Sequence, residues 1–586
     1  MGRTVLDMPT ALVRGSVALL ILMSGHSLHA AEAPAAPAAY AAAEKKLAEL
    51  TEQLKADPKR ADLWLARARL RVQIADPVGA LSDASEAIRL EPFSPDPRLA
   101  RAELLAGQGR WAEVVADATD GLATAPQSAE LLVLRARARR LLGQPELALA
   151  DANRAVEADK GTPGSLLERA WVHAFRGDWE GVLKDAEAAA GARPDLLEAL
   201  LLQGIARRER GEWDKAAESF SQVLKAEPKS ALAYLNRGQA LASKGATADA
   251  LRDFTSAIEA SPELAEALVQ RGRLRAEGSN LQGAVEDLSR AIQLRPRLAE
   301  AYLHRAIARE RLGDAALASE DAQVALSLGS RDPRAPLLLA RLDEARGAWD
   351  AMAEHARQAI QFHPKEPEAH RLLGRALKAQ GDDDAALAAI NKAIEVDPSD
   401  WRSHAERASF HNDKGRPDAA LADATKAVAL APKASLSYVL RARLLLGQKR
   451  APEAARDCDK ALELNPQDAM ALLVRARALS QQGKDAEALA DCSKAAKLAP
   501  TWAWTHATHG YVLQRAGKHD EAVKALARAL QMAPGDAEVH ASLGRAFLAL
   551  RRYRSAIQHL DRAVELDPRL ADELAKQIEE VKNRRE

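Results

Sequence analysis

Small and apolar residues recur along this chain at fixed positions of a 34-residue period. With a repeated proline taken as position 32, fifteen units run from Ala61 to Leu570, and position 8 is Gly or Ala in every unit, while positions 20 and 27 are mostly Ala. Such self-similarity is typical of an array of supersecondary units. The prolines that mark the period stand at 58, 92, 126, 194, 228, 262, 296, 364, 398, 432, 466, 500, 534 and 568.

The same pattern predicts two helices in each unit. Position 15 is Gly in eleven units, and Gly readily adopts the left-handed backbone that would end the first helix. The proline at position 32 cannot continue the second helix and so marks its end. Small residues at positions 8, 20 and 27 let helices approach closely, and a large residue there would overpack the contact. One unit cannot bury its apolar face alone, so units must stack. The predicted fold class is all-α, an α-solenoid of about fifteen 34-residue helix–turn–helix repeats.

These features resemble the tetratricopeptide repeat family over residues 61–570. The resemblance implies a right-handed superhelix with a concave, partner-binding groove lined by positions 2, 5, 9, 12, 13 and 34. The chain departs from the family at position 11, which is mostly Leu or Arg. It also departs in the unit 333–366, which has Pro336 at position 4. We expect this unit to be helical but locally less stable than the others. The family's aromatic positions 4 and 17 hold Trp64, Tyr234, Tyr302 and Tyr438, and Trp111, Trp179, Trp213, Trp349 and Tyr553.

Both ends of the array are predicted to be capping helices with a polar outer face, which a solenoid needs for solubility. Residues 31–60 would form an Ala/Pro tether followed by an N-terminal helix, and residues 571–586 a C-terminal helix. Their inward faces would be formed by Tyr40, Leu47, Leu50 and Leu54, and by Leu574, Ile578 and Val581.

An internal pairing is predicted from positions 7 and 23. Position 7 is Arg in ten units and position 23 is Asp in the same ten, for example Arg271 with Asp287. We expect a partly buried salt bridge between the two helices of one unit. Removing one partner should therefore lower the free energy of unfolding by more than breaking a surface pair would. Common descent of the units from one duplicated subtype would leave the same pattern.

Candidate ligand-binding residues are those that fall on the groove positions implied by the resemblance. Arginines at position 9 could form a basic ladder for an acidic peptide or an anionic polysaccharide, or acids at position 2, such as Glu130, could neutralise them. Exposed aromatic residues at groove positions could anchor peptides or sugars, or pack within the groove wall. The candidates are Arg69, Arg137, Arg273, Arg341, Arg375, Arg443, Arg477 and Arg545, with Trp171, Trp502, Trp504 and Tyr511. Of the aromatic residues, Trp502, Trp504 and Tyr511 are expected to meet at one stretch of the groove.

Composition and the N-terminus bear on partners and localisation. Lys+Arg and Asp+Glu both number 83, which argues against a general nucleic-acid binder. Residues 1–30 are predicted to be a cleavable signal peptide, and Met8 is an alternative start. The apolar run of this segment is too short to span a bilayer. No membrane span is therefore expected once the signal peptide has been removed. We therefore expect a periplasmic or secreted protein.

No catalytic, metal or cofactor site is predicted. The repeats leave too few residues for a catalytic domain, His506 is expected to be a packing residue, and Cys458 and Cys492 are expected to be small core residues rather than a disulfide. The resulting hypothesis is a non-enzymatic scaffold that binds an extended peptide or protein segment in its groove. The alternative is a periplasmic component of exopolysaccharide assembly or export that binds an anionic glycan.

Overall fold

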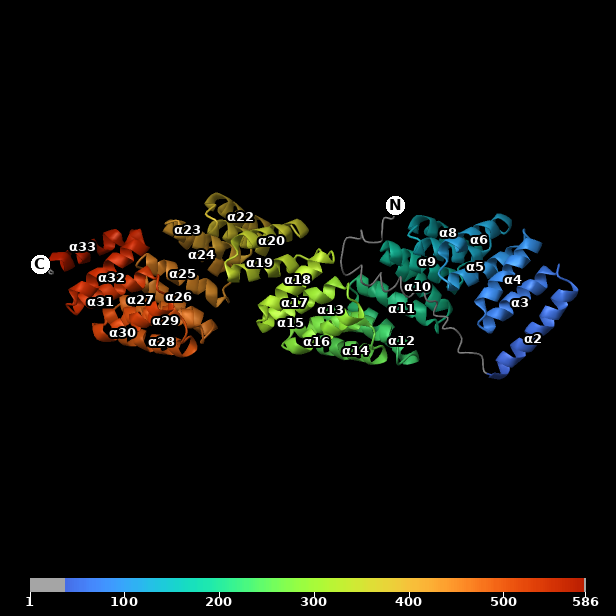
Figure 1. Cartoon of the computed structure of the whole chain (residues 1–586), viewed down its shortest axis with the longest axis horizontal. Coiled ribbons are helices and arrows are strands. Elements are labelled where there is room, and N and C mark those ends of the chain that lie inside the picture. Colours follow the sequence, from blue (N-terminus) through green and yellow to red (C-terminus); the bar gives the residue numbers. More distant parts are fainter. Residues whose placement is uncertain (1–36, 584–586) are drawn as a thin grey trace. The chain divides into compact units, whose positions relative to one another are not determined.

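The computed structural model describes residues 37–583, and all regular secondary structure in this range is helical (Figure 1). The chain divides after Ser330 into two compact units. The first holds an N-terminal helix and eight helix pairs, and the second holds seven helix pairs and a C-terminal helix. The predicted all-α repeat solenoid is confirmed, whereas the predicted signal peptide, residues 1–30, lies outside the described residues.

The helices of the first unit are α2 (Pro37–Ala56), α3 (Ala61–Gln73), α4 (Pro77–Leu90), α5 (Pro95–Gly107), α6 (Trp111–Thr124), α7 (Ala129–Leu141), α8 (Pro145–Ala158), α9 (Pro163–Arg176), α10 (Trp179–Ala192), α11 (Leu197–Glu209), α12 (Trp213–Ala226), α13 (Ala231–Lys244), α14 (Thr247–Ala260), α15 (Ala265–Glu277), α16 (Leu281–Leu294), α17 (Ala299–Leu312) and α18 (Ala315–Ser327). Those of the second unit are α19 (Arg334–Arg346), α20 (Trp349–Phe362), α21 (Pro367–Ala379), α22 (Asp383–Val396), α23 (Trp401–Asp413), α24 (Pro417–Leu430), α25 (Ser435–Gly447), α26 (Ala451–Leu464), α27 (Ala469–Gln481), α28 (Asp485–Leu498), α29 (Ala503–Arg515), α30 (His519–Met532), α31 (Ala537–Ala549), α32 (Tyr553–Leu566) and α33 (Ala571–Asn583), with a short 3₁₀ turn, η1 (Pro568–Leu570), before the last.

The turn inside fourteen of the fifteen helix pairs has left-handed backbone at position 15, the exception being the pair with Ser279. All eleven glycines of this position have positive φ, for example +74° at Gly177, and so do Ala75, Lys449 and Arg551, which replace glycine in three units. In four units the next residue caps the second helix, as where the Asp178 carboxylate accepts a hydrogen bond from the N–H three residues on. Position 15 therefore marks the end of the first helix in the fourteen units with left-handed backbone there.

The divergent unit 333–366 is helical, as predicted. Pro336 is the third residue of α19, in the first turn, where backbone N–H groups have no partner within the helix. Its ring is buried there. The proline thus ends no helix, and the division of the chain after Ser330 falls just before this unit.

Helices within a pair approach closely because positions 8 and 24 are matched in size. The six units with Gly at position 8 have Phe, Leu or Ile at 24, and the nine with Ala at 8 have Ala or Cys at 24. A methyl group on Gly204 would lie 2.6 Å from Cε1 of Phe220, which is fully buried. The predicted small residues at 20 and 27 also form the core, for example Ala250 and Ala257.

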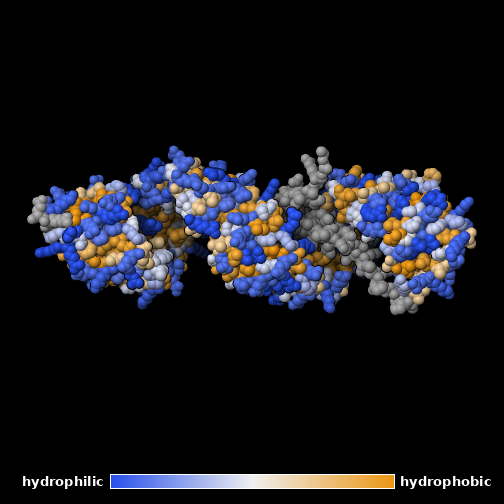
Figure 2. Space-filling model, viewed as in Figure 1, coloured by the Kyte–Doolittle hydropathy of each residue, from blue (hydrophilic) through white to orange (hydrophobic). Residues whose placement is uncertain are grey.

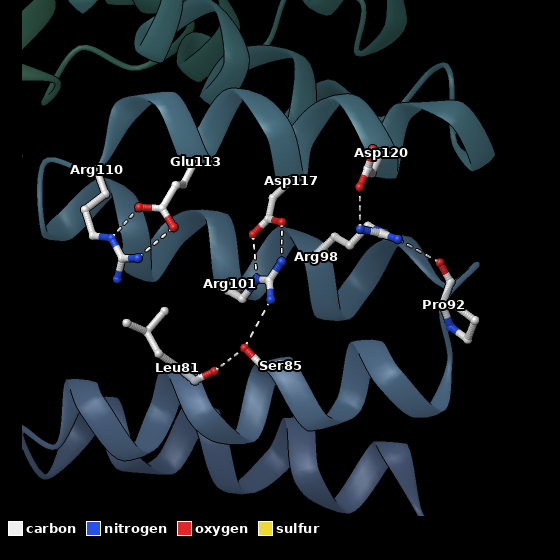
Figure 3. A network of polar contacts seen from close by, with 9 residues as sticks. All are labelled: Leu81, Ser85, Pro92, Arg98, Arg101, Arg110, Glu113, Asp117 and Asp120. Carbon is white, nitrogen blue, oxygen red and sulfur yellow. Dashed lines mark hydrogen bonds and ion pairs between the residues drawn. The ribbon is translucent and has the colours of Figure 1, made fainter.

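The predicted pairing of positions 7 and 23 is confirmed in all ten units. Each Arg donates from Nε and Nη2 to the two carboxylate oxygens of its Asp, as in Arg101 with Asp117 at 2.7 and 2.6 Å (Figure 3). Both partners lie largely out of solvent, and the fork geometry is the one that Arg offers and Lys does not. The other pairs are Arg67–Asp83, Arg135–Asp151, Arg169–Asp185, Arg237–Asp253, Arg271–Asp287, Arg305–Asp321, Arg407–Asp423, Arg441–Asp457 and Arg475–Asp491.

The remaining guanidinium nitrogen links nine of these ten arginines to the preceding repeat or capping helix, which the sequence analysis missed. In Figure 3, Arg101 Nη1 donates to the Ser85 hydroxyl at 3.1 Å, and Ser85 in turn donates to the carbonyl of Leu81. Nine of the ten arginines make this bond to a Ser, Thr, Asn or Asp at position 25 of the helix before. One guanidinium therefore joins three helices and helps to fix the stacking.

The capping helices bury most of their predicted apolar faces. Leu50 and Leu54 of α2 are buried, as are Leu574 and Val581 of α33. Tyr40 is the exception, because its side chain is largely exposed near the start of α2.

Candidate functional site

Most arginines of the proposed basic ladder are paired with carboxylates of this chain. Six of the eight arginines are therefore neutralised by acids of this chain, which was the alternative to a free basic ladder. Only two of the six acidic partners, Glu368 and Glu538, stand at position 2. The pairs are Arg137–Glu168, Arg273–Glu277, Arg341–Glu368, Arg375–Glu344, Arg477–Glu538 and Arg545–Glu573.

Two ladder arginines, Arg69 and Arg443, differ from the rest. Both are exposed and make no hydrogen bond or ion pair within the described range 37–583. Arg69 still lies in the field of Glu103, whose pKa is raised by burial and partly lowered again by this arginine. Arg443, on α25, is thus the ladder member with the least internal compensation.

Trp171 is not an exposed anchor, so this part of the sequence prediction is wrong. Only 7% of the residue is exposed, and its indole N–H donates to Glu198 Oε1 at 2.6 Å. The Arg140 guanidinium lies 5.7 Å from its ring centroid, and Phe175 is buried as well. The position-9 aromatic of this unit therefore packs within the wall, because the acid and arginine on the neighbouring first helices satisfy its polar edge.

Trp502 and Trp504 line an open hollow in the second unit, here called the tryptophan hollow. Its volume is about 500 Å³, and its lining consists of Met470, Thr501, Trp502, Ala503, Trp504 and Met532. Trp502 is 45% exposed, while Trp504 is partly buried against the core that surrounds Leu472. On the face shown in Figure 2, apolar residues are interspersed with hydrophilic ones over both units.

The turn before α29 holds these two tryptophans in place. Pro500 stops α28, and Trp502 has extended backbone as the N-cap of α29. The hydroxyl of Thr505 donates to the Ala499 carbonyl, and His506 Nε2 lies 3.2 Å from the Pro500 carbonyl, which can only accept. His506 thus fastens the turn, as predicted for a packing residue.

Tyr511 does not join the tryptophan hollow, contrary to the expectation that all three aromatic residues meet. Instead it lies near Arg477 of the neighbouring helix α27 and Arg515 of its own helix α29, whose guanidinium carbons are 5.0 and 6.0 Å from its ring centroid. Arg515 is exposed, and its Nε donates to the Ser480 carbonyl. Sequence reasoning missed Arg515, although position 13 is a groove position.

Acidic residues are missing from three consecutive first helices around the hollow. Helices α25, α27 and α29 contain no Asp or Glu, and their arginines at position 7 are taken up by Asp457 and Asp491 of the following helices. Arg443, Arg477 and Arg515 remain. We call the hollow together with these three arginines the α25–α30 surface.

Comparison with known families accounts for the repeat. The family model described as tetratricopeptide repeat matches residues 201–265, 337–400, 371–435, 439–501 and 508–571. The chain is a tetratricopeptide repeat protein.

Solved structures of other tetratricopeptide repeat and related chains are similar only at low identity. A chain of the APC/C hetero-tetramer Cut9–Hcn1 has 16% identity and a TM-score of 0.49, with 77% of this chain and 96% of that chain covered. The tetratricopeptide repeat protein YrrB, whose structure has an unusual peptide-binding site, has 21% identity and a TM-score of 0.28, with 31% and 95% covered. A chain of Naa15/Naa10 bound to HypK-THB has 15% identity and a TM-score of 0.30, with 88% and 96% covered. No curated protein matches this tetratricopeptide repeat chain.

The two cysteines of this tetratricopeptide repeat protein are core residues, as predicted. Cys458 and Cys492 are unbridged and buried, and burial raises the pKa of the Cys492 thiol to about 12. Both thiols therefore stay protonated and unreactive. No helix within residues 37–583 has the length and apolarity to cross a membrane.

Proposed function

We propose that this protein is a non-enzymatic scaffold that binds an extended segment of another protein, and that the α25–α30 surface is its binding site. Tetratricopeptide repeats support a role in protein interaction in general. The tryptophan hollow carries the specific proposal, because an exposed Trp beside an open apolar hollow is the kind of feature that anchors a partner side chain.

The surroundings of the hollow favour a segment longer than one side chain. Exposed apolar side chains continue from it at position 30 of successive units, in Leu464, Leu498 and Met532, and at position 2 in Leu436, which is 62% exposed. These residues recur every 34 positions on stacked helices, so an extended chain running across the units would meet one after another. Apolar residues exposed in such a row usually mark an interaction surface.

Selection from a random 12-residue peptide display library against the full chain tests the proposal. We expect selected peptides to lose at least tenfold in affinity on the Trp502→Ala/Trp504→Ala double variant. Trp349→Ala is the matched control, since Trp349 is also partly exposed in the second unit but lies on α20, and it should leave the affinity unchanged.

The alternative partner, an anionic glycan, is an outcome of the same experiment. Polygalacturonate is offered in parallel with the peptides, and its capture should fall steeply with salt if charge alone held it. Capture of polygalacturonate without any peptide that depends on the two tryptophans would overturn the proposal.

A further inference from the structure

We infer that the segment bound at the α25–α30 surface carries acidic residues beside its apolar anchor, and that Arg443, Arg477 and Arg515 recognise them. The inference rests on the proposed function and adds the charge of the ligand. It depends on a local imbalance, because the whole chain has equal numbers of acidic and basic residues.

The imbalance extends over three consecutive first helices, α25, α27 and α29, none of which contains Asp or Glu. Asp468 stands at a groove position between α25 and α27, but both of its carboxylate oxygens already accept hydrogen bonds. One accepts from the Ala471 N–H at 3.0 Å and so caps α27, and the other accepts from the Ser435 hydroxyl at 2.8 Å. Arg443 has no partner among residues 37–583. The positive charge of Arg443 is therefore left uncompensated here.

Earlier helices of the same unit show the contrast. In α21 the arginines at groove positions meet acids across the stack: Arg371 lies 3.2 Å from Asp400, and Arg375 lies 2.6 Å from Glu344. Lys378 is paired with Asp413. A ligand carboxylate would have to displace an existing partner in that stretch, whereas around α25 it would not.

Tyr511 brings two positive charges together on α29, the helix that also holds Trp504. The guanidinium carbons of Arg477 and Arg515 both lie within 6.0 Å of its ring centroid, a distance at which a ring face attracts each cation while the two cations repel each other. A ligand carboxylate between them would offset that repulsion and could accept a forked pair of hydrogen bonds.

The partner that Arg477 already has can be exchanged. Its ion pair with Glu538 has an N–O distance of 3.0 Å, and the Glu538 side chain is 67% exposed. An exposed pair of this kind contributes little to stability. Glu538 thus occupies the site that a ligand carboxylate would take, and its removal should favour acidic ligands.

The composition of the display-selected peptides tests the inference directly. Peptides retained by the full chain should be enriched in Asp and Glu over the unselected library. The tightest of them, made with a fluorescein label, should bind at least tenfold more weakly when Asn and Gln replace its acids.

Charge variants give opposite shifts, which a folding defect cannot do. Arg443→Gln/Arg515→Gln should weaken the labelled acidic peptide about tenfold, Glu538→Gln should tighten it severalfold, and Arg69→Gln, an exposed ladder arginine of the first unit, should have no effect. Peptides that depend on Trp502 and Trp504 but show no acidic enrichment would overturn the inference and leave the proposed function standing. A failure of Glu538→Gln to tighten binding would also overturn the role given to Arg477.

Discussion

Replacing Gly204 by Ala is expected to destabilise the pair α11–α12, although alanine is the better helix former. Gly204 lies inside α11, and the added methyl would sit 2.6, 2.8 and 2.9 Å from three ring atoms of Phe220. Phe220 is fully buried, so its ring has no space into which to move.

The magnitudes of the two opposing effects decide the sign. Overpacking of a well-packed contact costs ~1–3 kcal/mol, while Gly to Ala within a helix gains ~1 kcal/mol from propensity. The net expectation for Gly204→Ala is a loss of about 1 kcal/mol. At Gly191 in α10 a methyl would meet nothing within 4 Å, so Gly191→Ala should gain up to ~1 kcal/mol and serves as the control.

Hydrogen exchange followed by mass spectrometry measures the effect locally, which matters because an array of repeats does not unfold in one step. Opening free energies for α11–α12 in Gly204→Ala and for α10 in Gly191→Ala should change in opposite directions. In a Phe220→Ala background, Gly204→Ala should become stabilising, since that pair reproduces the Ala/Ala contact of other units. If Gly204→Ala stabilises the protein while Phe220 is present, the size-matching argument is wrong.

Three further predictions concern charge, pH and processing. Arg237→Leu and Asp253→Leu should each lower the free energy of unfolding by about 3 kcal/mol, because each leaves a partly buried partner unpaired. The double variant should lose much less than the sum of the two single variants. Additive losses, measured by denaturation of the two single variants and the double variant, would contradict the pairing. Burial, and then the charge of His540, lower the pKa of His559, so the folded state binds fewer protons than the unfolded state. The last repeat should therefore lose stability as the pH falls below 6.5, the ordinary pKa of histidine. Equal hydrogen-exchange rates of α31–α33 at about pH 7.5 and about pH 5.5, after correction for the intrinsic pH dependence of exchange, would refute this. Bacterial expression should yield a chain that begins at Ala31, and an intact mass that retains residues 1–30 would rule out the predicted cleavage.

The helical pairs and the Arg–Asp bridges could be predicted because each depends on residues of a single unit. The period places positions 7 and 23 opposite each other whatever the stacking of units. The bond from Arg101 to Ser85 was missed for the converse reason, since it depends on how one repeat lies on the previous one. Its signal was present as a polar residue at position 25.

The candidate site was predicted less well because side-chain packing decides exposure. Trp171 and Trp504 both stand at groove positions, but Trp171 has a hydrogen-bonding carboxylate, Glu198, and an arginine nearby, and becomes buried. Tyr511 was expected in the hollow, but its ring lies against Arg477 of the neighbouring helix α27 and Arg515 of its own helix α29. Position within the repeat therefore predicts which face a residue is on, and the neighbouring units decide whether it is accessible.

The central claim is that a partner segment occupies the α25–α30 surface, and hydrogen exchange of the full chain with and without the tightest selected peptide tests it most directly. The account predicts slower exchange in α25, α27 and α29 and in the turn around Trp502, with exchange of α3–α18 unchanged. Protection confined to other helices, or protection of α27 and α29 that persists in the Trp502→Ala/Trp504→Ala variant, would contradict it.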